Sequence, residues 1–165
     1  MTPAIRALDA AGIPYQVLRY QVDETSNLGV AAAAALRLDP TVVFKTLIFE
    51  WEGGNHGVAV IPVAESLDLK ALGRICGTKS ATLAPAITAE RLTGYVIGGI
   101  SPIGQKRQLP TFIDSRALLL DTLYISAGRR GLELGIASRD LIDCCQARVA
   151  DLTTAHRANG PSAIG

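Results

Sequence analysis

Two pairs of apolar segments separated by turn residues limit the folds open to this chain of 165 residues. The first pair, residues 42–51 and 58–63, is rich in β-branched and aromatic side chains, and three glycines and an asparagine lie between the two segments. The second pair, residues 123–126 and 132–136, brackets a five-residue connection with two glycines. Both patterns predict antiparallel hairpins. They argue against a purely parallel, doubly wound sheet.

Helices and shorter strands are expected around these hairpins. Capping and glycine signals predict helices between Thr2 and Gly12, from Gly29 to Leu38, from Asp68 to Gly77, from Pro85 to Thr93, and after Ser138 as N-cap. Alternating or short apolar runs predict strands at residues 13–20, 95–97 and 111–113. We therefore predict a single α/β domain with a mixed, strongly curved, barrel-like β-sheet and packed helices.

Composition narrows the class of protein. Hydrophobic residues make up 48% of the chain, enough for one core, and no apolar run approaches the ~20 residues of a membrane-spanning helix. The N-terminus lacks the pattern of a secretory signal, so we expect a cytoplasmic protein. Cys76, Cys144 and Cys145 include no CxxC spacing, which argues against a disulfide framework or a cysteine zinc site. We expect no metal and no cofactor.

Positive charge is concentrated in one segment. Residues 101–131 carry five basic and two acidic side chains, whereas the rest of the chain carries eleven basic and thirteen acidic ones. A local patch matters more for nucleic-acid binding than the net charge of +1. Lys106, Arg107, Arg129 and Arg130 adjoin glycine-rich turns. They could bind a phosphate backbone or form an ordinary solvated surface, and their clustering favours the first.

The stretch from Gly98 to Arg107 is the most informative loop. Three glycines and one proline fall between Gly98 and Gly104, which indicates a tight backbone that can turn several N–H groups towards an anion or a carbonyl oxygen. A plain connection between strands is the alternative. A serine triad built on Ser101 is improbable, because the G-x-S-x-G pattern is missing and neither His56 nor His156 is convincingly placed as a base.

Lys45 interrupts an otherwise apolar strand. Alternation places it on the same face as Val43, Leu47 and Phe49. Its ammonium group could simply reach water at a strand edge. If that face lines a pocket, the lysine could instead hold a phosphate or polarise an ester. Cys144 and Cys145 follow apolar helical residues and are interpreted as small buried side chains rather than nucleophiles.

These residues together resemble the YbaK family of Cys-tRNA(Pro) deacylases, relatives of the editing domain of bacterial prolyl-tRNA synthetases. The resemblance covers about the first 150 residues in the same order. It is carried by Thr2-Pro3-Ala4, Phe44-Lys45-Thr46-Leu47, Thr93-Gly94-Tyr95, the loop from Gly98 to Lys106, and the hairpin from Tyr124 to Leu132. It implies an editing domain over residues 1–157. The small and polar residues at 158–165 are expected to form a flexible C-terminal tail.

The resemblance also implies an activity. Members of this family cleave the ester between a mischarged amino acid and the terminal ribose of tRNA without a protein nucleophile. The thiol of the substrate cysteine attacks its own ester carbonyl, so the protein mainly orients the reacting groups. The expected function is removal of cysteine from tRNA(Pro), and from tRNA(Cys) as well. The expected partners are the acceptor end of mischarged tRNA and, in a transient complex, prolyl-tRNA synthetase, with no membrane and no DNA.

Site residues follow from the same resemblance. Lys45 corresponds to the lysine that holds the terminal nucleotide, and Lys45, Gly99 and Ser101 are the expected catalytic positions. The expected substrate-binding positions are Tyr20, Thr46, Gly98, Ile100, Pro102, Gly104, Ser126 and Arg129. Lys106, Arg107 and Arg130 are assigned to the tRNA backbone. The chain departs from the family at residues 21–23 and 28–29, which bears on the preferred amino acid.

Two other functions are compatible with the sequence, and neither uses attack by a substrate thiol. A related deacylase could remove another small residue, such as alanine, through an activated water. A non-catalytic module could instead grip a tRNA end or a synthetase. Retention of both Lys45 and the glycine loop argues against the second alternative.

Overall fold

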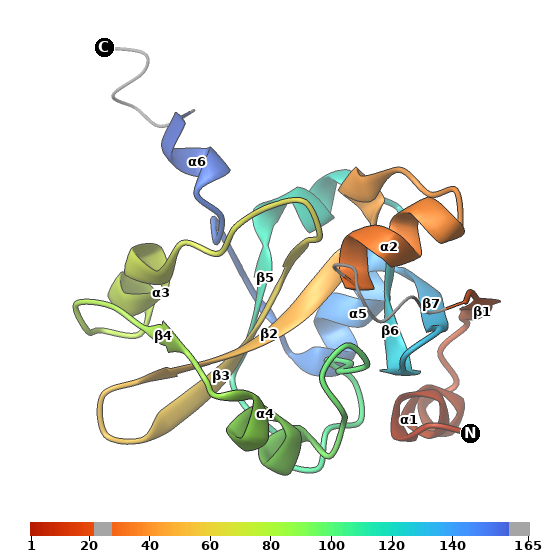
Figure 1. The fold of residues 1–165 in the computed structure, drawn as a ribbon, viewed down its shortest axis with the longest axis horizontal. Coiled ribbons are helices and arrows are strands. Elements are labelled where there is room, and N and C mark those ends of the chain that lie inside the picture. Colours follow the sequence, from red (N-terminus) through yellow and green to blue (C-terminus); the bar gives the residue numbers. More distant parts are fainter. Residues whose placement is uncertain (22–27, 159–165) are drawn as a thin grey trace.

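The structure is a computed structural model that describes residues 1–21 and 28–158 (Figure 1). The helices are α1 (Pro3–Ala11), α2 (Leu28–Ala35), α3 (Leu69–Ile75), α4 (Ala86–Thr93), α5 (Ser138–Cys145) and α6 (Ala155–Ala158), with 3₁₀ turns η1 (Pro40–Val42) and η2 (Ser115–Leu119). The strands are β1 (Gln16–Arg19), β2 (Phe44–Trp51), β3 (Asn55–Pro62), β4 (Thr82–Leu83), β5 (Thr111–Asp114), β6 (Thr122–Arg129), β7 (Leu132–Ala137) and β8 (Arg148–Ala150). The tail expected at residues 158–165 lies outside the described residues apart from Ala158.

Both predicted hairpins are confirmed. β2 and β3 pair in antiparallel register along their whole length. β6 and β7 pair in the same way, with an irregular register between Ser126 and Arg129. Local turn chemistry is sufficient to predict these pairings, because a short glycine-containing connection joins neighbouring antiparallel strands.

Helix starts agree with the sequence in two cases and differ in a third. The Thr2 hydroxyl accepts from the Ile5 N–H, and the Asp68 carboxylate accepts from the Ala71 N–H. Ser138 is the first residue of α5, and Ala137 occupies the cap position without a side-chain hydrogen bond. The prediction that Ser138 caps this helix is therefore wrong.

The strands form two sheets rather than one. One sheet has the order β1-β7-β6, and the other has the order β4-β2-β3-β5-β8, with parallel pairing of β5 to β3 and β8. The mixed α/β architecture is as predicted, but the barrel-like sheet is not supported, since neither sheet closes within the described part of the chain. A single parallel bridge between Val43 and Tyr124 connects the two sheets. Beyond that bridge β2 and β6 diverge.

The segment from Tyr95 to Ile97 is not a strand, contrary to prediction. The Tyr95 hydroxyl donates to the Ile103 carbonyl over 2.6 Å, and the Ile97 N–H donates to the Glu90 carboxylate. Hydrogen bonds within the loop and to α4 therefore replace the strand ladder. The apolar character of this run reflects the burial of Tyr95, which is 3% exposed, instead of sheet pairing.

The main core fills the space between the two sheets. It combines Phe44, Ile48 and Val60 of the larger sheet with the apolar residues of β6 and β7 and the buried face of α1. A second cluster, which includes Phe49 and Leu72, packs α3 against the opposite face of the larger sheet. Apolar packing thus holds the two sheets together, and within the described residues their edges pair only at the Val43–Tyr124 bridge.

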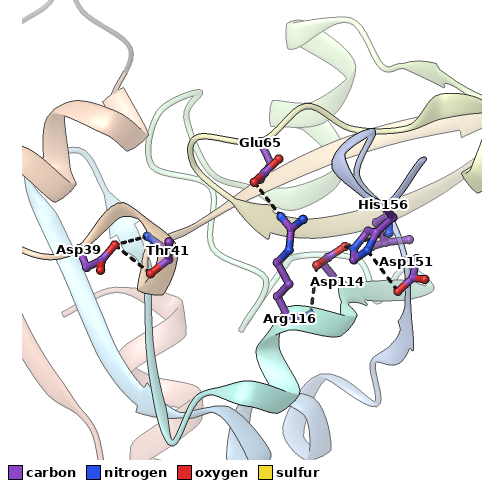
Figure 2. A network of polar contacts seen from close by, with 8 residues as sticks. Asp39, Thr41, Glu65, Asp114, Arg116, Asp151 and His156 are labelled. Atoms are coloured by element: carbon purple, nitrogen blue, oxygen red, sulfur yellow. Dashed lines mark hydrogen bonds and ion pairs between the residues drawn. The ribbon is translucent and has the colours of Figure 1, made fainter. Parts of the chain in front are cut away.

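The C-terminal helix is held by a buried carboxylate. Asp114 is fully buried and accepts from the Leu152 N–H, the Arg116 N–H and the His156 ring, the last over 2.9 Å (Figure 2). Arg157 forms a second anchor with Asp68. No helix of the described residues is long and apolar enough to cross a membrane.

Candidate functional site

A small cavity lies at the edge of β2, where the two sheets diverge. Val43 meets β6 at one end of this edge, and Phe49 and Glu50 pair with β4 at the other. No strand of residues 1–21 or 28–158 pairs with the stretch between them. The Ile48 carbonyl accepts from the Ala84 N–H on this edge, so the main-chain groups of Thr46, two residues away, face the same side.

The cavity has a volume of about 260 Å³. Its walls come from β2, the start of α2, the glycine loop and the β6–β7 hairpin. The lining residues are Tyr20, Gly29, Val43, Phe44, Lys45, Thr46, Leu47, Ile97, Gly98, Ile100, Ser126 and Glu133. Six residues assigned from the sequence therefore meet here: Tyr20, Lys45, Thr46, Gly98, Ile100 and Ser126.

Lys45 supplies the positive charge of the cavity. Its neighbours in the strand, Phe44 and Ile48, face the main core, which places Lys45 on the other face as alternation predicts. Burial lowers the pKa of its ammonium group, and the nearby Glu65 carboxylate opposes this effect. Glu65 is paired with Arg116 at 2.7 Å (Figure 2). Within the described chain Lys45 has no ion-pair partner, so its charge is available to a ligand.

Glu133 supplies a buried carboxyl group to the same cavity. It is 5% exposed, and its Oε2 atom has no hydrogen-bond partner among the described residues. Burial raises the pKa of Glu133 to about 8. The carboxyl group is therefore mostly protonated near neutral pH. Lys45 and Glu133 do not form an ion pair, and they lie on strands of different sheets.

Three hydroxyl groups complete the polar lining. Thr46 Oγ1 is buried without a partner in the described structure. Ser126 lies directly across the hairpin from Glu133, and its Oγ accepts from the Gly128 N–H, which leaves the hydroxyl hydrogen free to donate. Burial and the charge of Glu133 raise the pKa of the Tyr20 phenol. The cavity thus offers several donors to an oxygen-rich ligand.

The glycine loop contributes only part of its length to this cavity. Gly98, at φ +89°, and Ile100 line it. Ser101 is fully buried, and its Oγ accepts from the Ile103 N–H within the loop. A Cβ atom at Gly99 would lie 2.9 Å from the main chain of Arg129. Gly99 and Ser101 therefore shape the loop and its contact with the hairpin, and neither lines the cavity.

The remaining assigned residues lie elsewhere. Pro102 and Gly104 line a second cavity behind the glycine loop. Arg129 lines another groove together with Arg19. The two arginines flank Leu132 of β7, which pairs with Arg19 of β1 on one side and with Arg129 of β6 on the other. The Arg130 guanidinium donates to the Ile97 carbonyl over 2.8 Å and so connects the hairpin to the loop.

Lys106 and Arg107 are exposed. Their main-chain N–H groups donate to α4, at Thr93 and Leu92, so their side chains remain available at the surface. The departures at residues 21–23 lie mostly outside the described residues.

Glu133 and Arg19 were not anticipated. Glu133 interrupts an apolar strand in the way that Lys45 does, so the same alternation signal was present at residues 132–136. Arg19 gave no such signal, because the sequence does not show that β1 lies beside β7. Its place in the groove depends on sheet order alone.

Among the described residues, the cavity lining contains no pairing of a nucleophile with a base. His56 contacts Glu50 and His156 contacts Asp114, both away from the lining. Within the described ranges, no group of three or more His, Cys, Asp or Glu side chains could hold a metal ion. The arrangement is suited to binding and polarising a ligand that has a negative group near Lys45 and a polar or cationic group near Glu133.

The fold is that of an aminoacyl-tRNA editing domain. The family model described as "Aminoacyl-tRNA editing domain" matches residues 24–144, and the protein belongs to this family. The resemblance drawn from the sequence is thereby confirmed. The expectation of an aminoacyl-tRNA deacylase is confirmed at the level of the family.

Individual relatives agree with this placement. The chain is 31% identical over 153 residues, 93% of each protein, to an Enterococcus faecalis protein named "Putative Cys-tRNA(Pro)/Cys-tRNA(Cys) deacylase EbsC". A crystal structure of "a putative trans-editing enzyme for prolyl tRNA synthetase" superimposes with a TM-score of 0.79 at 25% identity, covering 93% of this chain and 98% of the other. The structure of "hypothetical protein APE2540" gives 0.83 at 27% identity, covering 92% and 99%.

Proposed function

We propose that the protein removes cysteine from mischarged tRNA(Pro), and from tRNA(Cys) as well, by assisting attack of the substrate thiol on its own ester. The observation that carries this proposal is a cavity lined by both the Lys45 ammonium group and the buried Glu133 carboxyl group, without a nucleophile–base pair among the described residues. An aminoacyl ester of tRNA has the complementary polarity, with an α-ammonium group at one end and phosphates at the other. The relative named as a Cys-tRNA deacylase supports the choice of amino acid.

The size of the cavity agrees with a small amino acid. At about 260 Å³ it is smaller than the roughly 300–1,000 Å³ of pockets that enclose a drug-sized ligand. The aminoacyl group can enter, while the terminal nucleotide remains at the mouth. Lys45 holds that nucleotide by charge. Glu133 receives the α-ammonium group, which favours its carboxylate form.

The protein then contributes mainly geometry. The open edge of β2 and the N–H groups of the glycine loop hold the ester carbonyl as negative charge develops on its oxygen. The thiol loses its proton and attacks the carbonyl carbon, and the ribose hydroxyl leaves with a proton. The first product is a cyclic thiolactone. Holding the thiol in a near-attack position can supply several kcal/mol without a protein nucleophile.

The test is deacylation of Cys-tRNA, Ser-tRNA and Ala-tRNA by the purified protein. Serine is nearly the size of cysteine, but its hydroxyl is a far weaker nucleophile near neutral pH than a thiol with a reference pKa of about 8.5. Cys-tRNA should be cleaved much faster, and the thiolactone should precede free cysteine. Equal rates with immediate release of free amino acid would instead identify a water-based hydrolase.

A transient complex with prolyl-tRNA synthetase and residence in the cytoplasm, where translation occurs, belong to the same proposal. The crystal structure described as a trans-editing enzyme for prolyl tRNA synthetase supports the complex. Adding the synthetase should increase the rate on Cys-tRNA(Pro) but leave the rate on Cys-tRNA(Cys) unchanged. Binding of tRNA without cleavage in either assay would point to the non-catalytic alternative.

A further inference from the structure

The glycine loop separates the proposed active site from a second cavity of about 240 Å³. Ile97, Gly98 and Ile100 face the first cavity. The next residues of the loop line the second cavity, together with α1 and the end of α5. The lining residues include Leu8, Pro102, Ile103, Cys144 and Cys145. We call this second cavity the rear cavity. A structural change there can therefore be transmitted to the active site through a few residues of the loop backbone.

The rear cavity contains two adjacent thiols. The sulfur atoms of Cys144 and Cys145 are 4.0 Å apart. Cys145 is 5% exposed, and its S–H donates to the Pro102 carbonyl over 3.4 Å. Cys144 is exposed, and its S–H donates to the Leu141 carbonyl within α5. One thiol is thus open to solvent, and the other touches the loop.

The exposed member of the pair is the one favoured to ionise. An S–H donated by Cys145 stabilises the thiolate of Cys144 and lowers the pKa of Cys144, although burial and the carboxylates of Asp140 and Asp143 oppose this. The same interaction and burial raise the pKa of Cys145. Because Cys145 has one hydrogen, ionisation of Cys144 draws that hydrogen away from Pro102.

We propose that Cys144 and Cys145 form a redox-active dithiol that a hydroperoxide converts to a disulfide, and that this change displaces the glycine loop. The Cys144 thiolate attacks the peroxide oxygen, which gives a sulfenic acid and releases an alkoxide that takes up a proton. The Cys145 thiol then attacks the sulfenic sulfur, the S–S bond forms, and water leaves. The two thiols lose two electrons in total, and the hydroperoxide is reduced to an alcohol and water. The effect on activity rests on the function proposed above.

The geometry makes this disulfide strained and easily reversed. Adjacent Cα atoms across a trans peptide are about 3.8 Å apart, shorter than the roughly 4.4–6.8 Å usual for disulfides. Bringing the sulfurs from 4.0 Å to bonding distance requires the last turn of α5 to open. Cys145 then leaves Pro102. Strained and exposed disulfides are the readily reduced ones, which suits a reversible modification.

Mass spectrometry after treatment with hydrogen peroxide tests the chemistry. The protein should lose two hydrogen atoms, and the bond should map to the peptide that contains both cysteines. Cys76 should stay free for alkylation, because burial raises its pKa. Retention of both thiols, added oxygen as the final product at Cys144, or a disulfide that involves Cys76 would overturn the proposal.

Hydrogen exchange tests the effect on the loop independently of activity. Oxidation should speed exchange at Ile103 and Lys106, whose amides are hydrogen-bonded in and beside the loop, and dithiothreitol should restore slow exchange. Deacylation should fall by about tenfold or more on oxidation, since a displacement of ~1 Å can cost roughly 100-fold. Cys145→Ser should abolish both responses, and Cys76→Ser should retain them. Unchanged exchange in the disulfide form would refute the coupling, whereas a lack of deacylation by the reduced protein would refute only the proposed function.

Discussion

Two buried carboxyl groups in this protein have opposite surroundings. Asp114 is fully buried and has three hydrogen-bond partners, among them His156 (Figure 2). Glu133 is nearly as buried, but its Oε2 has no partner in the described residues and it faces a cavity. A buried polar group without a partner is costly. The satisfied carboxyl stabilises the fold, and the unsatisfied one is available to a ligand.

Substitution of Lys45, which lines the same cavity as Glu133, should have the largest effect on activity. Lys45→Ala should reduce kcat/KM for Cys-tRNA by roughly 100- to 1,000-fold, because the main positive charge of the cavity is lost. Lys45→Arg should also be impaired, since a planar fork does not replace a compact ammonium in a confined site. Thermal unfolding should be nearly unchanged in both variants. Lys70→Ala, on the exposed surface of α3, is the matched control. Full activity of the alanine variant would remove Lys45 from the mechanism.

Substitution of Asp114 tests the structural role of the hydrogen-bonded carboxyl group. Asp114→Ala should lower the free energy of unfolding by about 3 kcal/mol, because two N–H groups and His156 lose their buried acceptor. Urea denaturation measures this loss, and Asp121→Ala, at an exposed position, should change little. The activity of each folded molecule should persist, since Asp114 does not line the cavity. A loss of kcat/KM as large as that of Lys45→Ala would contradict the division between the two carboxyl groups.

Glu133→Gln should remove a pH dependence of stability. The folded pKa of Glu133 is raised to about 8 from an ordinary value of 4.5. Between these values the folded state holds a proton that the unfolded state releases, so stability falls as pH rises through this window. The difference in the free energy of unfolding between the wild type and Glu133→Gln should change by roughly 1–3 kcal/mol from pH 6 to pH 8. The variant should gain stability relative to the wild type at pH 8. Urea denaturation at both values measures it, and Glu52→Gln, an exposed control, should show no such change.

Replacing all three cysteines should have the smallest effect on catalysis. The serine variant of Cys76, Cys144 and Cys145 should retain activity under reducing conditions, because the reacting thiol belongs to the substrate. Burial of a hydroxyl in place of Cys145 can cost about 1–3 kcal/mol of stability. If the triple variant folds but has no deacylase activity, and restoring one cysteine alone restores that activity, the reacting thiol belongs to the protein.

Local signals in the sequence predicted the parts of the fold that depend on neighbouring residues. The hairpins and the caps at Thr2 and Asp68 are of this kind. The division into two sheets was not predictable, because it depends on where β6 leaves β2 after a single bridge at Val43. The short strands β4 and β8 were also missed, since two or three residues carry no periodic pattern.

The candidate site shows the same limit. Alternation identified Lys45 and could have identified Glu133. It could not show that successive loop residues face different cavities, with Gly98 in front and Pro102 behind. Side-chain direction in an irregular loop follows from tertiary contacts, such as the hydrogen bond from Tyr95 to Ile103. The assignments of Gly99 and Ser101 as catalytic positions therefore stay predictions.

The unpaired edge of β2 around Thr46 also bears on how large a molecule the protein can admit. An open strand edge can usually pair with an additional strand from another chain. Here β6 and β4 border the opening at Val43 and at Phe49, and the cavity beside it has a volume of only about 260 Å³. A cavity of this size agrees with one small aminoacyl group, whereas a peptidyl chain has to extend beyond it along the open edge. We therefore expect peptidyl-tRNA, an intermediate of translation, to be a poor substrate.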